Sequence, residues 1–161
     1  MRGEMLRLRR VEQGDCRLLW EWANDPVVRS ASFSSEYIPW EHHQHWFGAQ
    51  LTDPNAILYL AADSDNVSIG QVRYQVEGPR AQLSVSLAPE FRGKGYGNRI
   101  VVMATEELFR NTNVTTIDAY VKPANQASLR LFLRAGFKQL DTSAIHGQPA
   151  IHFILQKNGN S

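Results

Sequence analysis

A run dense in glycine, between a strand pattern and a helix pattern, constrains this chain more than any other feature. The run covers residues 87–97 and reads Leu-Ala-Pro-Glu-Phe-Arg-Gly-Lys-Gly-Tyr-Gly. Glycine lets the backbone take positive φ and approach a ligand closely. The N–H groups at the start of the following helix then converge at its positive end, where they favour an anion such as a pyrophosphate. Because Arg92 and Lys94 add positive charge, the run predicts a phosphate-binding loop.

Two better-known phosphate motifs do not fit this run. The dinucleotide fingerprint needs its first glycine directly after a first strand, and the nucleoside-triphosphate loop ends in Gly-Lys-Ser or Gly-Lys-Thr. Neither pattern is present here. On these residues alone, a surface loop made flexible by glycine is an equally good interpretation.

The hydrophobic periodicity predicts an α/β fold with a mixed sheet. Strand patterns cover residues 6–11, 56–62, 67–76, 80–87, 115–121, 137–140 and 150–155. Helical patterns follow Asp15, Pro39, Gly97 and Asn125, and the residues expected to face inward from the last of them are Leu129, Phe132 and Leu133. We therefore expect a mixed, mostly antiparallel sheet of about seven strands with four helices on both faces. At 161 residues the chain suits one domain, placed at 1–157, followed by a disordered tail at 158–161.

Charge and cysteine content narrow the function classes. Lys and Arg total 17 against 16 Asp and Glu, a balance that disfavours binding to nucleic acid or to an anionic membrane. The longest apolar run, residues 56–62, is far too short to span a bilayer, and the first residues lack the pattern of a secretory signal. Cys16 is the only cysteine and cannot form an internal disulfide. These features predict a cytoplasmic protein.

Two segments of the second half resemble the GNAT family of acetyltransferases. Residues 92–97, Arg-Gly-Lys-Gly-Tyr-Gly, match the family pattern Gln/Arg-x-x-Gly-x-Gly/Ala, which binds pyrophosphate. Residues 120–137 are similar to the family's fifth strand and following helix, with Asn125, Ser128 and the terminal Gly136-Phe137 in place. Both segments occur in the family's order within the expected succession of strands and helices.

The resemblance implies that acetyl-CoA is the cosubstrate and that the protein is an N-acetyltransferase. The strand before the glycine loop and the strand before Asn125 would splay apart, and pantetheine would enter the gap beside backbone groups near Leu87. The cofactor-binding residues implied by the resemblance are Leu87, Ala88, Arg92, Gly93, Lys94, Gly95, Tyr96, Gly97, Asn98, Asn125, Ser128 and Phe132.

Two positions depart from the family pattern. Many members place a glutamate base five residues before the motif asparagine, where this chain has Tyr120. Many place a tyrosine acid in the following helix, where this chain has Phe132, which cannot donate a proton. Tyr120 is therefore a candidate catalytic residue, although a tyrosine packed in a central strand explains it equally well. Ser86, which with Ser84 occupies alternate positions of the strand before the loop, is a second candidate that could hold a relay water.

The acceptor side is predicted in residues 28–47, where aromatic, hydroxyl and carboxylate side chains gather. Such a set suits a sugar or nucleoside better than a lipid. Residues 20–47 also resemble GNAT members that acetylate nucleotide-linked amino sugars, such as those of pseudaminic acid synthesis. We therefore expect a small-molecule amine as the partner, with the substrate-binding candidates Phe33, Tyr37, Trp40 and His43.

Other interpretations stay open at this stage. Residues 6–9 and 24–29 also resemble acetyltransferases of protein N-termini and ribosomal proteins, and the two departures would suit a CoA-binding module without turnover. His42 and His45 share a helical face, yet no cysteine or carboxylate motif completes a metal set, so no metal is expected. A histidine, including His146 or His152, could accept the amine proton. The oligomeric state is left open, a homodimer being one possibility.

Overall fold

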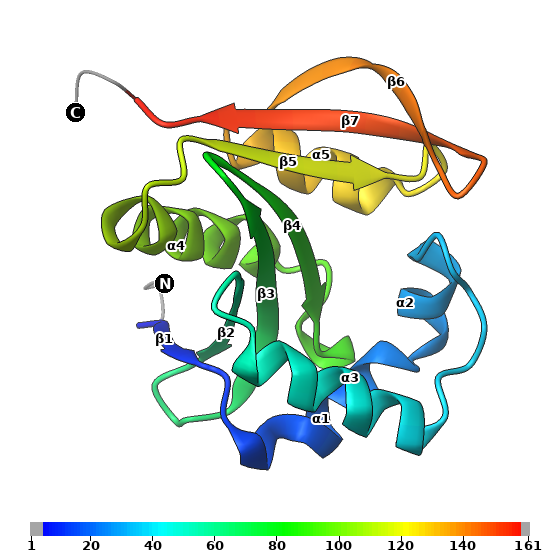
Figure 1. The fold of residues 1–161 in the computed structure, drawn as a ribbon, viewed down its shortest axis with the longest axis vertical. Coiled ribbons are helices and arrows are strands. Elements are labelled where there is room, and N and C mark those ends of the chain that lie inside the picture. Colours follow the sequence, from blue (N-terminus) through cyan, green and yellow to red (C-terminus); the bar gives the residue numbers. More distant parts are fainter. Residues whose placement is uncertain (1–4, 159–161) are drawn as a thin grey trace.

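A mixed β-sheet between two layers of helices forms the centre of the protein (Figure 1), whose computed structural model describes residues 5–158. Two single 3₁₀ turns lie at 13–15 and 89–91. The elements in chain order are β1 (Arg7–Arg10), α1 (Cys16–Ala23), α2 (Pro26–Ala31), α3 (Trp40–Thr52), β2 (Ala56–Ala62), β3 (Ser68–Glu77), β4 (Arg80–Leu87), α4 (Tyr96–Asn111), β5 (Thr116–Val121), α5 (Gln126–Arg134), β6 (Lys138–Ile145) and β7 (Gln148–Gln156).

The strand order confirms the predicted sheet. Within residues 5–158 the sheet has seven strands in the order β1-β2-β3-β4-β5-β7-β6. Only β4 and β5 run parallel, and every other neighbouring pair is antiparallel. None of the helices in this part of the chain is long and apolar enough to cross a membrane.

The expected number of four helices is wrong by one, because the described residues contain five. The helix that the sequence did not predict is α2, which starts directly after the residues that end α1. Asp25 accepts a hydrogen bond from the Val27 N–H at 2.9 Å and so caps α2, while Pro26 occupies its first position. Proline lacks a backbone N–H, and this costs little at the first position because an N–H there would have no partner inside the helix. One Asn-Asp-Pro run thus ends one helix and begins the next.

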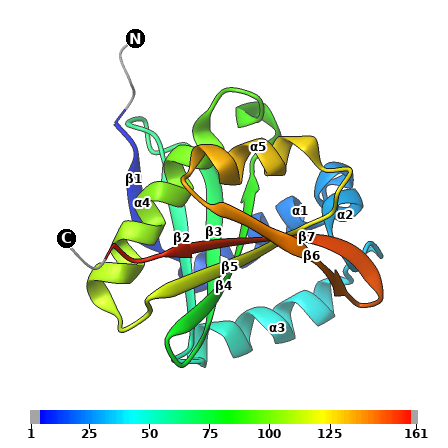
Figure 2. The same ribbon diagram turned by 90° about the horizontal axis from the view of Figure 1, so that it is seen from above.

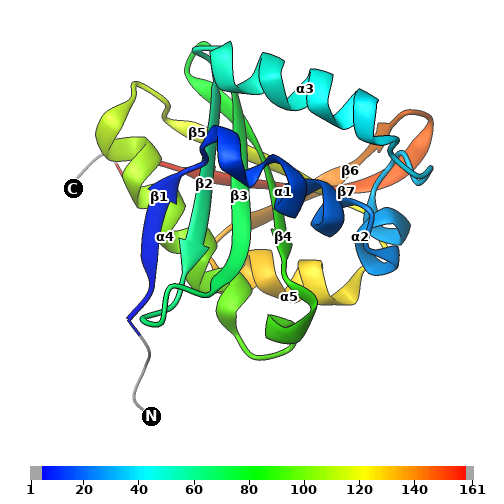
Figure 3. The ribbon, with the colours of Figure 1, turned by 90° about the horizontal axis from the view of Figure 1, so that it is seen from below.

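The two faces of the sheet bury separate cores, and β2 contributes to both. Its residues alternate, so Leu58 and Leu60 pack on one face with Leu19 of α1 and Phe47 of α3. Its intervening residues pack on the other face in the cluster that includes α4 and α5. Figures 2 and 3 show α3 on one side of the sheet and α4 and α5 on the other. Burial on both faces explains why this strand reads as a continuous apolar run.

The parallel pair β4/β5 opens into a V, as the family resemblance implied. Pairing covers only Arg80↔Thr116, Ala81↔Ile117 and Gln82↔Asp118. From residue 83 to residue 87, β4 pairs with β3 alone. Figure 1 shows the two strands diverging toward the glycine loop. The edge of β4 that faces β5 is therefore left without a strand partner over five residues.

Two details of the C-terminal part differ from the prediction. Leu133 was expected to face inward but is 53% exposed, whereas Phe132 is buried. The cause is the contact of α5 with α4, where a Cβ on Gly97 would overlap Leu131; this close approach turns Leu131 inward and Leu133 outward. The last hairpin also extends over residues 141–145, which include three polar residues, and residues 142–145 pair with β7. The predicted tail lies outside the described residues except for Asn158.

Candidate active site

A cleft of about 980 Å³ opens where β4 and β5 diverge. Its wall joins the glycine loop and α5 to the segment that connects α2 and α3. It brings most of the predicted site residues together, and these are Phe33, Tyr37, His43, Ser86, Leu87, Arg92, Gly93, Gly95, Gly97, Asn98, Tyr120, Asn125, Ser128 and Phe132. The donor and acceptor regions inferred from separate parts of the sequence thus share one continuous cleft.

The glycine loop lies at the start of α4, where the sequence predicts an anion site. Gly95 is the N-cap of α4 and has a φ of +84°, a left-handed conformation that other residues rarely adopt. No side chain caps this end of the helix. The first N–H groups of α4 therefore have no acceptor inside the helix and remain available to an anion. Asn125 in turn caps α5 by accepting the Ser128 N–H at 3.2 Å.

The positive charge at the loop comes partly from residues that the sequence analysis missed. Arg92 lines the cleft, but its Nη2 donates to Asp25 Oδ1 at 2.9 Å and to the Leu87 carbonyl at 3.4 Å. Lys94 is exposed and is not a lining residue. Arg130 and Arg134 of α5 line the cleft instead, and their i, i+4 spacing, which places them on one helix face, was the available signal.

The bond between Arg92 and Asp25 also connects the two halves of the site. Asp25 caps α2, so the glycine loop is held against the helices of the acceptor side. Lys122 Nζ donates to the Ser30 carbonyl at 3.0 Å, and Gln148 Nε2 donates to the Phe33 carbonyl at 2.7 Å. These bonds fix residues 30–33 against the β5/β7 side of the cleft.

Four predicted binding residues are not lining residues of the cleft: Ala88, Lys94, Tyr96 and Trp40. Ala88 is buried and its N–H already donates to the Ile69 carbonyl at 2.8 Å. Tyr96 packs edge-on against Phe91, with ring centroids 5.4 Å apart. Trp40 packs against Trp20 with centroids 5.0 Å apart. In the described structure these three support the walls of the cleft.

His43 is buried in the acceptor wall, only 3% exposed, with its ring stacked against Trp40 and Phe47. Its Nε2 lies 2.9 Å from the Cys16 carbonyl, which can only accept, so Nε2 carries the proton. Burial lowers the pKa of His43, and the bond to the Cys16 carbonyl only partly opposes this. His43 is therefore a neutral packing residue at physiological pH. Within residues 5–158, no group of three His, Cys, Asp or Glu side chains is placed to hold a metal ion.

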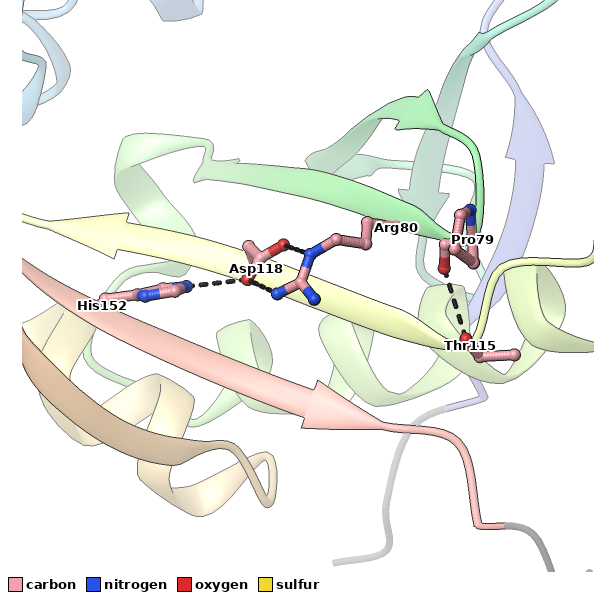
Figure 4. Close-up of polar contacts among 5 residues, drawn as sticks. All are labelled: Pro79, Arg80, Thr115, Asp118 and His152. Carbon is pink, nitrogen blue, oxygen red and sulfur yellow. Dashed lines mark hydrogen bonds and ion pairs between the residues drawn. The ribbon is translucent and has the colours of Figure 1, made fainter.

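Tyr120 lies beside a polar network that spans three strands. Figure 4 shows the members of this network, Arg80, Asp118 and His152. The Tyr120 ring stacks on His152 of β7 with centroids 4.5 Å apart and an interplanar angle of 15°. His152 Nε2 donates to Asp118 Oδ1 at 2.7 Å, while Arg80 donates to both carboxylate oxygens at 2.7 and 2.9 Å. Since Arg80 is the first paired residue of β4 and Asp118 is the last paired residue of β5, the network spans the paired, closed end of the V.

The network has opposite effects on the acidity of its members. Burial alone would raise the pKa of Asp118, but the hydrogen bonds from Arg80 and His152 outweigh it, so the pKa lies below its ordinary value. Burial, and then the negative charge of Asp118, raise the pKa of Tyr120. Tyr120 therefore keeps its proton at neutral pH.

We expect Asp118→Asn to destabilise the protein by about 1–2 kcal/mol, because it weakens charge-assisted bonds from two neighbours. Urea unfolding at neutral pH measures the loss. The stability that ionised Asp118 contributes is present above its unfolded pKa of about 4 and is lost as the pH falls through its lower folded pKa. The difference in unfolding free energy between wild type and variant should therefore disappear in that acid range. Asp141→Asn, at an exposed site, is the control, and an equal effect there would contradict the account.

Ser86 and Phe132 complete the centre of the cleft. Gln71 Nε2 donates to Ser86 Oγ at 3.3 Å, so the Ser86 hydroxyl can direct its own proton into the cleft. Phe132 is 3% exposed and packs on Phe137 and Phe153. It is part of the core and offers no proton, so the acid position of the family pattern is apolar here.

The comparisons with known proteins agree with this architecture. Residues 5–138 match the family model described as the acetyltransferase (GNAT) domain. The spermidine N(1)-acetyltransferase of Vibrio cholerae is 24% identical over 138 residues, which are 84% of this chain and 80% of that protein. The aminoglycoside N(6')-acetyltransferase type 1 of Klebsiella pneumoniae is 32% identical over 62 residues, 38% of this chain and 31% of that protein.

Solved structures share the whole fold. The Vibrio cholerae spermidine N-acetyltransferase, solved with CoA and spermine, superposes with a TM-score of 0.84 at 22% identity, covering 94% of this chain and 95% of that one. The aminoglycoside acetyltransferase AAC(6')-Ib, solved with ribostamycin and coenzyme A, gives a TM-score of 0.84 at 21% identity over 95% and 94% of the two chains.

These proteins are named for polyamines and aminoglycosides, so they do not support the narrower resemblance to enzymes of pseudaminic acid synthesis. The broader assignment rests on the family model, which spans most of the chain and includes the glycine loop. The chain therefore belongs to the GNAT family, N-acetyltransferases whose acetyl donor is acetyl-CoA.

Proposed function

We propose that the protein transfers the acetyl group of acetyl-CoA to a primary amine of a small molecule, with an amino sugar as the acceptor class. The observation that carries the proposal is the single cleft, in which an anion-binding helix start and an aromatic acceptor wall share one volume with Tyr120. Positioning an amine and a thioester within contact in such a cleft supplies much of the rate of transfer.

The donor half fits the chemistry of CoA. The free N–H groups of α4, with Arg130 and Arg134, suit the phosphates. The edge of β4 from residue 83 to residue 87 has no partner on the β5 side, and its backbone groups suit the amides of pantetheine. A chain held along this edge directs its thioester toward the middle of the cleft.

The transfer itself requires that a neutral amine attacks the thioester carbonyl carbon. A C–N bond forms, the C–S bond breaks, the amine nitrogen loses a proton and the CoA sulfur gains one. Tyr120 is the proton donor to sulfur in this proposal, because it lines the cleft and its phenol carries a proton at neutral pH. The cleft is open to solvent, so water can take the amine proton, with the Ser86 hydroxyl able to hold that water.

The acceptor wall supports a small polar molecule. Phe33 and Tyr37 line the cleft together with the hydroxyl groups of Ser32 and Ser34. Aromatic faces beside hydroxyls suit a sugar ring, which has apolar faces and a polar rim. The names of the related proteins, for spermidine and for aminoglycosides, support small-molecule amines as the acceptor class.

The test is release of the CoA thiol from acetyl-CoA across a panel of amines. The panel contains free and nucleotide-linked amino sugars, an aminoglycoside, spermidine and peptides with free N-termini. We expect release with amino sugars. Release with peptides alone would move the protein to the protein-acetylating branch. Tight acetyl-CoA binding with no release on any amine would instead favour a CoA-binding module, for which Phe132 is the structural indication.

A further inference from the structure

We infer that the acceptor carries an anionic group, a carboxylate or a phosphate, which binds to Arg73 in the floor of the cleft. This inference rests on the proposed function, because it names the class of amine that the same cleft takes. It is carried by the arrangement of charge on the acceptor side.

Arg73 is a half-buried cation without a counter-ion. It lies on β3 and lines the cleft, and its side chain forms no hydrogen bond or ion pair within residues 5–158. Its neighbours include the Trp46 ring, whose centroid lies 5.0 Å from the guanidinium carbon, and the cation of Arg29. Burial, and then Arg29, lower the pKa of Arg73, yet a guanidinium stays charged at neutral pH. A charge that is partly shielded from water in this way favours a bound counter-ion.

Arg29 adds a second uncompensated charge to the same region. Its guanidinium donates to the carbonyls of Ala23, Ser34 and Glu36 and to the Ser32 hydroxyl, at 2.6 to 3.2 Å. All of these acceptors are neutral, so they hold the side chain in place without cancelling its charge. Two positive charges therefore face the acceptor volume together, and an anion bound there would relieve both.

The carboxylates nearby do not offset these charges. Glu36 is the one acidic side chain among the described lining residues, and it is exposed at the segment between α2 and α3. The other cleft arginines belong to the donor half, where Arg92 is already paired with Asp25. Asp118 is engaged by Arg80 and His152 and is not a lining residue.

The neighbouring strand supplies further donors for an anion. Arg73 and Ser84 are direct partners in the β3/β4 register, so their side chains lie on the same face of the sheet. Ser84 lines the cleft, and its hydroxyl has no hydrogen-bond partner in the described part of the chain. A guanidinium beside a free hydroxyl is a suitable pair for a carboxylate or phosphate oxygen.

The same charges affect the amine. A positive potential disfavours the ammonium form, so it increases the fraction of neutral amine that can attack the thioester. It also repels a polycation, which has no anion to place against Arg73. Spermidine is therefore expected to be a poor acceptor here, although related proteins are named for it.

The experiment uses three sugars that differ only at C6: glucosamine, glucosamine 6-phosphate and glucosaminuronate, with spermidine as a fourth amine. Thiol release gives kcat/KM for each, and calorimetry gives the affinity of each for the CoA-saturated protein. We expect one or both anionic sugars to exceed glucosamine by about tenfold or more, the size of one charge-assisted contact. The phosphate and carboxylate arms identify which anion the site takes.

Arg73→Gln should remove this preference, and Arg73→Lys should restore part of it because the charge is kept. Arg134→Gln is the matched control at the donor end, and it should raise KM for acetyl-CoA while leaving the sugar preference intact. Melting temperatures confirm that each variant is folded.

The two hypotheses fail in different ways. Glucosamine or spermidine turning over as well as the anionic sugars, or a preference unchanged in Arg73→Gln, would overturn the anion inference and leave the acetyltransferase intact. No turnover with any amine would count against the proposed function. In that case the affinities of the sugars for the CoA-saturated protein test the anion inference. Equal affinities for all three sugars would overturn it as well.

Discussion

Replacing Gly95 with aspartate is expected to lower the affinity for acetyl-CoA at least a hundredfold, which corresponds to about 2.8 kcal/mol. Gly95 caps α4, whose first N–H groups have no other acceptor, and the new carboxylate would lie at this anion site and repel the phosphates. The fold should survive at a conformational cost of about 1–2 kcal/mol for the positive φ, because nothing lies within 4 Å of a Cβ built at this position. Isothermal titration with acetyl-CoA measures the loss.

Gly95→Asn separates charge from strain in this experiment. Asparagine has the shape of aspartate and tolerates positive φ, so both variants carry a similar conformational cost at a φ of +84°. The neutral variant should keep most of the affinity. Unchanged affinity in a folded Gly95→Asp protein would mean that the glycine loop does not hold the pyrophosphate.

Replacing Tyr120 with phenylalanine is expected to lower kcat by about a hundredfold or more, the usual contribution of a positioned proton donor. The ring and its stacking on His152 are retained, so the change removes only the hydroxyl group. Affinity for acetyl-CoA and the melting temperature should stay close to wild type. Steady-state kinetics with the best acceptor from the amine panel, together with these two measurements, gives the comparison.

Tyr37→Phe is the matched control, because Tyr37 also lines the cleft but is 65% exposed on the acceptor side. Loss of its hydroxyl should affect KM for the acceptor and leave kcat nearly unchanged. If Tyr120→Phe kept wild-type kcat, Tyr120 would be a packing residue of β5 and the sulfur would receive its proton from water.

The succession of strands along the chain followed from the sequence because local pattern and final environment agree along most of the chain. The predicted ranges for β2 and β4 match the structure residue for residue, since apolar runs between turn-forming residues leave few alternatives. The helix α2 was missed because Pro26, a residue type that usually ends helices, here occupies the first position of one. The polar half of β6 was missed because its pairing with β7, and not its own pattern, makes it a strand.

The site was predictable where a short motif defines it and not where tertiary packing does. The loop at 92–97 and the cap at Asn125 form as expected. Arg92 was assigned to the phosphates, but its bond to Asp25 depends on helices 67 residues away in sequence. Arg73 was missed, although the alternation of Gln71, Arg73 and Gln75 in β3 already indicated a polar face on a central strand.

The measurement that tests the central claim most directly is product analysis after incubation with acetyl-CoA carrying an isotopically labelled acetyl group. Wild-type protein and Gly95→Asp are compared on the amine panel, and mass spectrometry follows the acetylated amine while a thiol reagent follows free CoA. The account predicts one labelled amide for each thiol released by wild type, and neither product above background with Gly95→Asp. Thiol release without a labelled amide, or equal amide formation by both proteins, would contradict it.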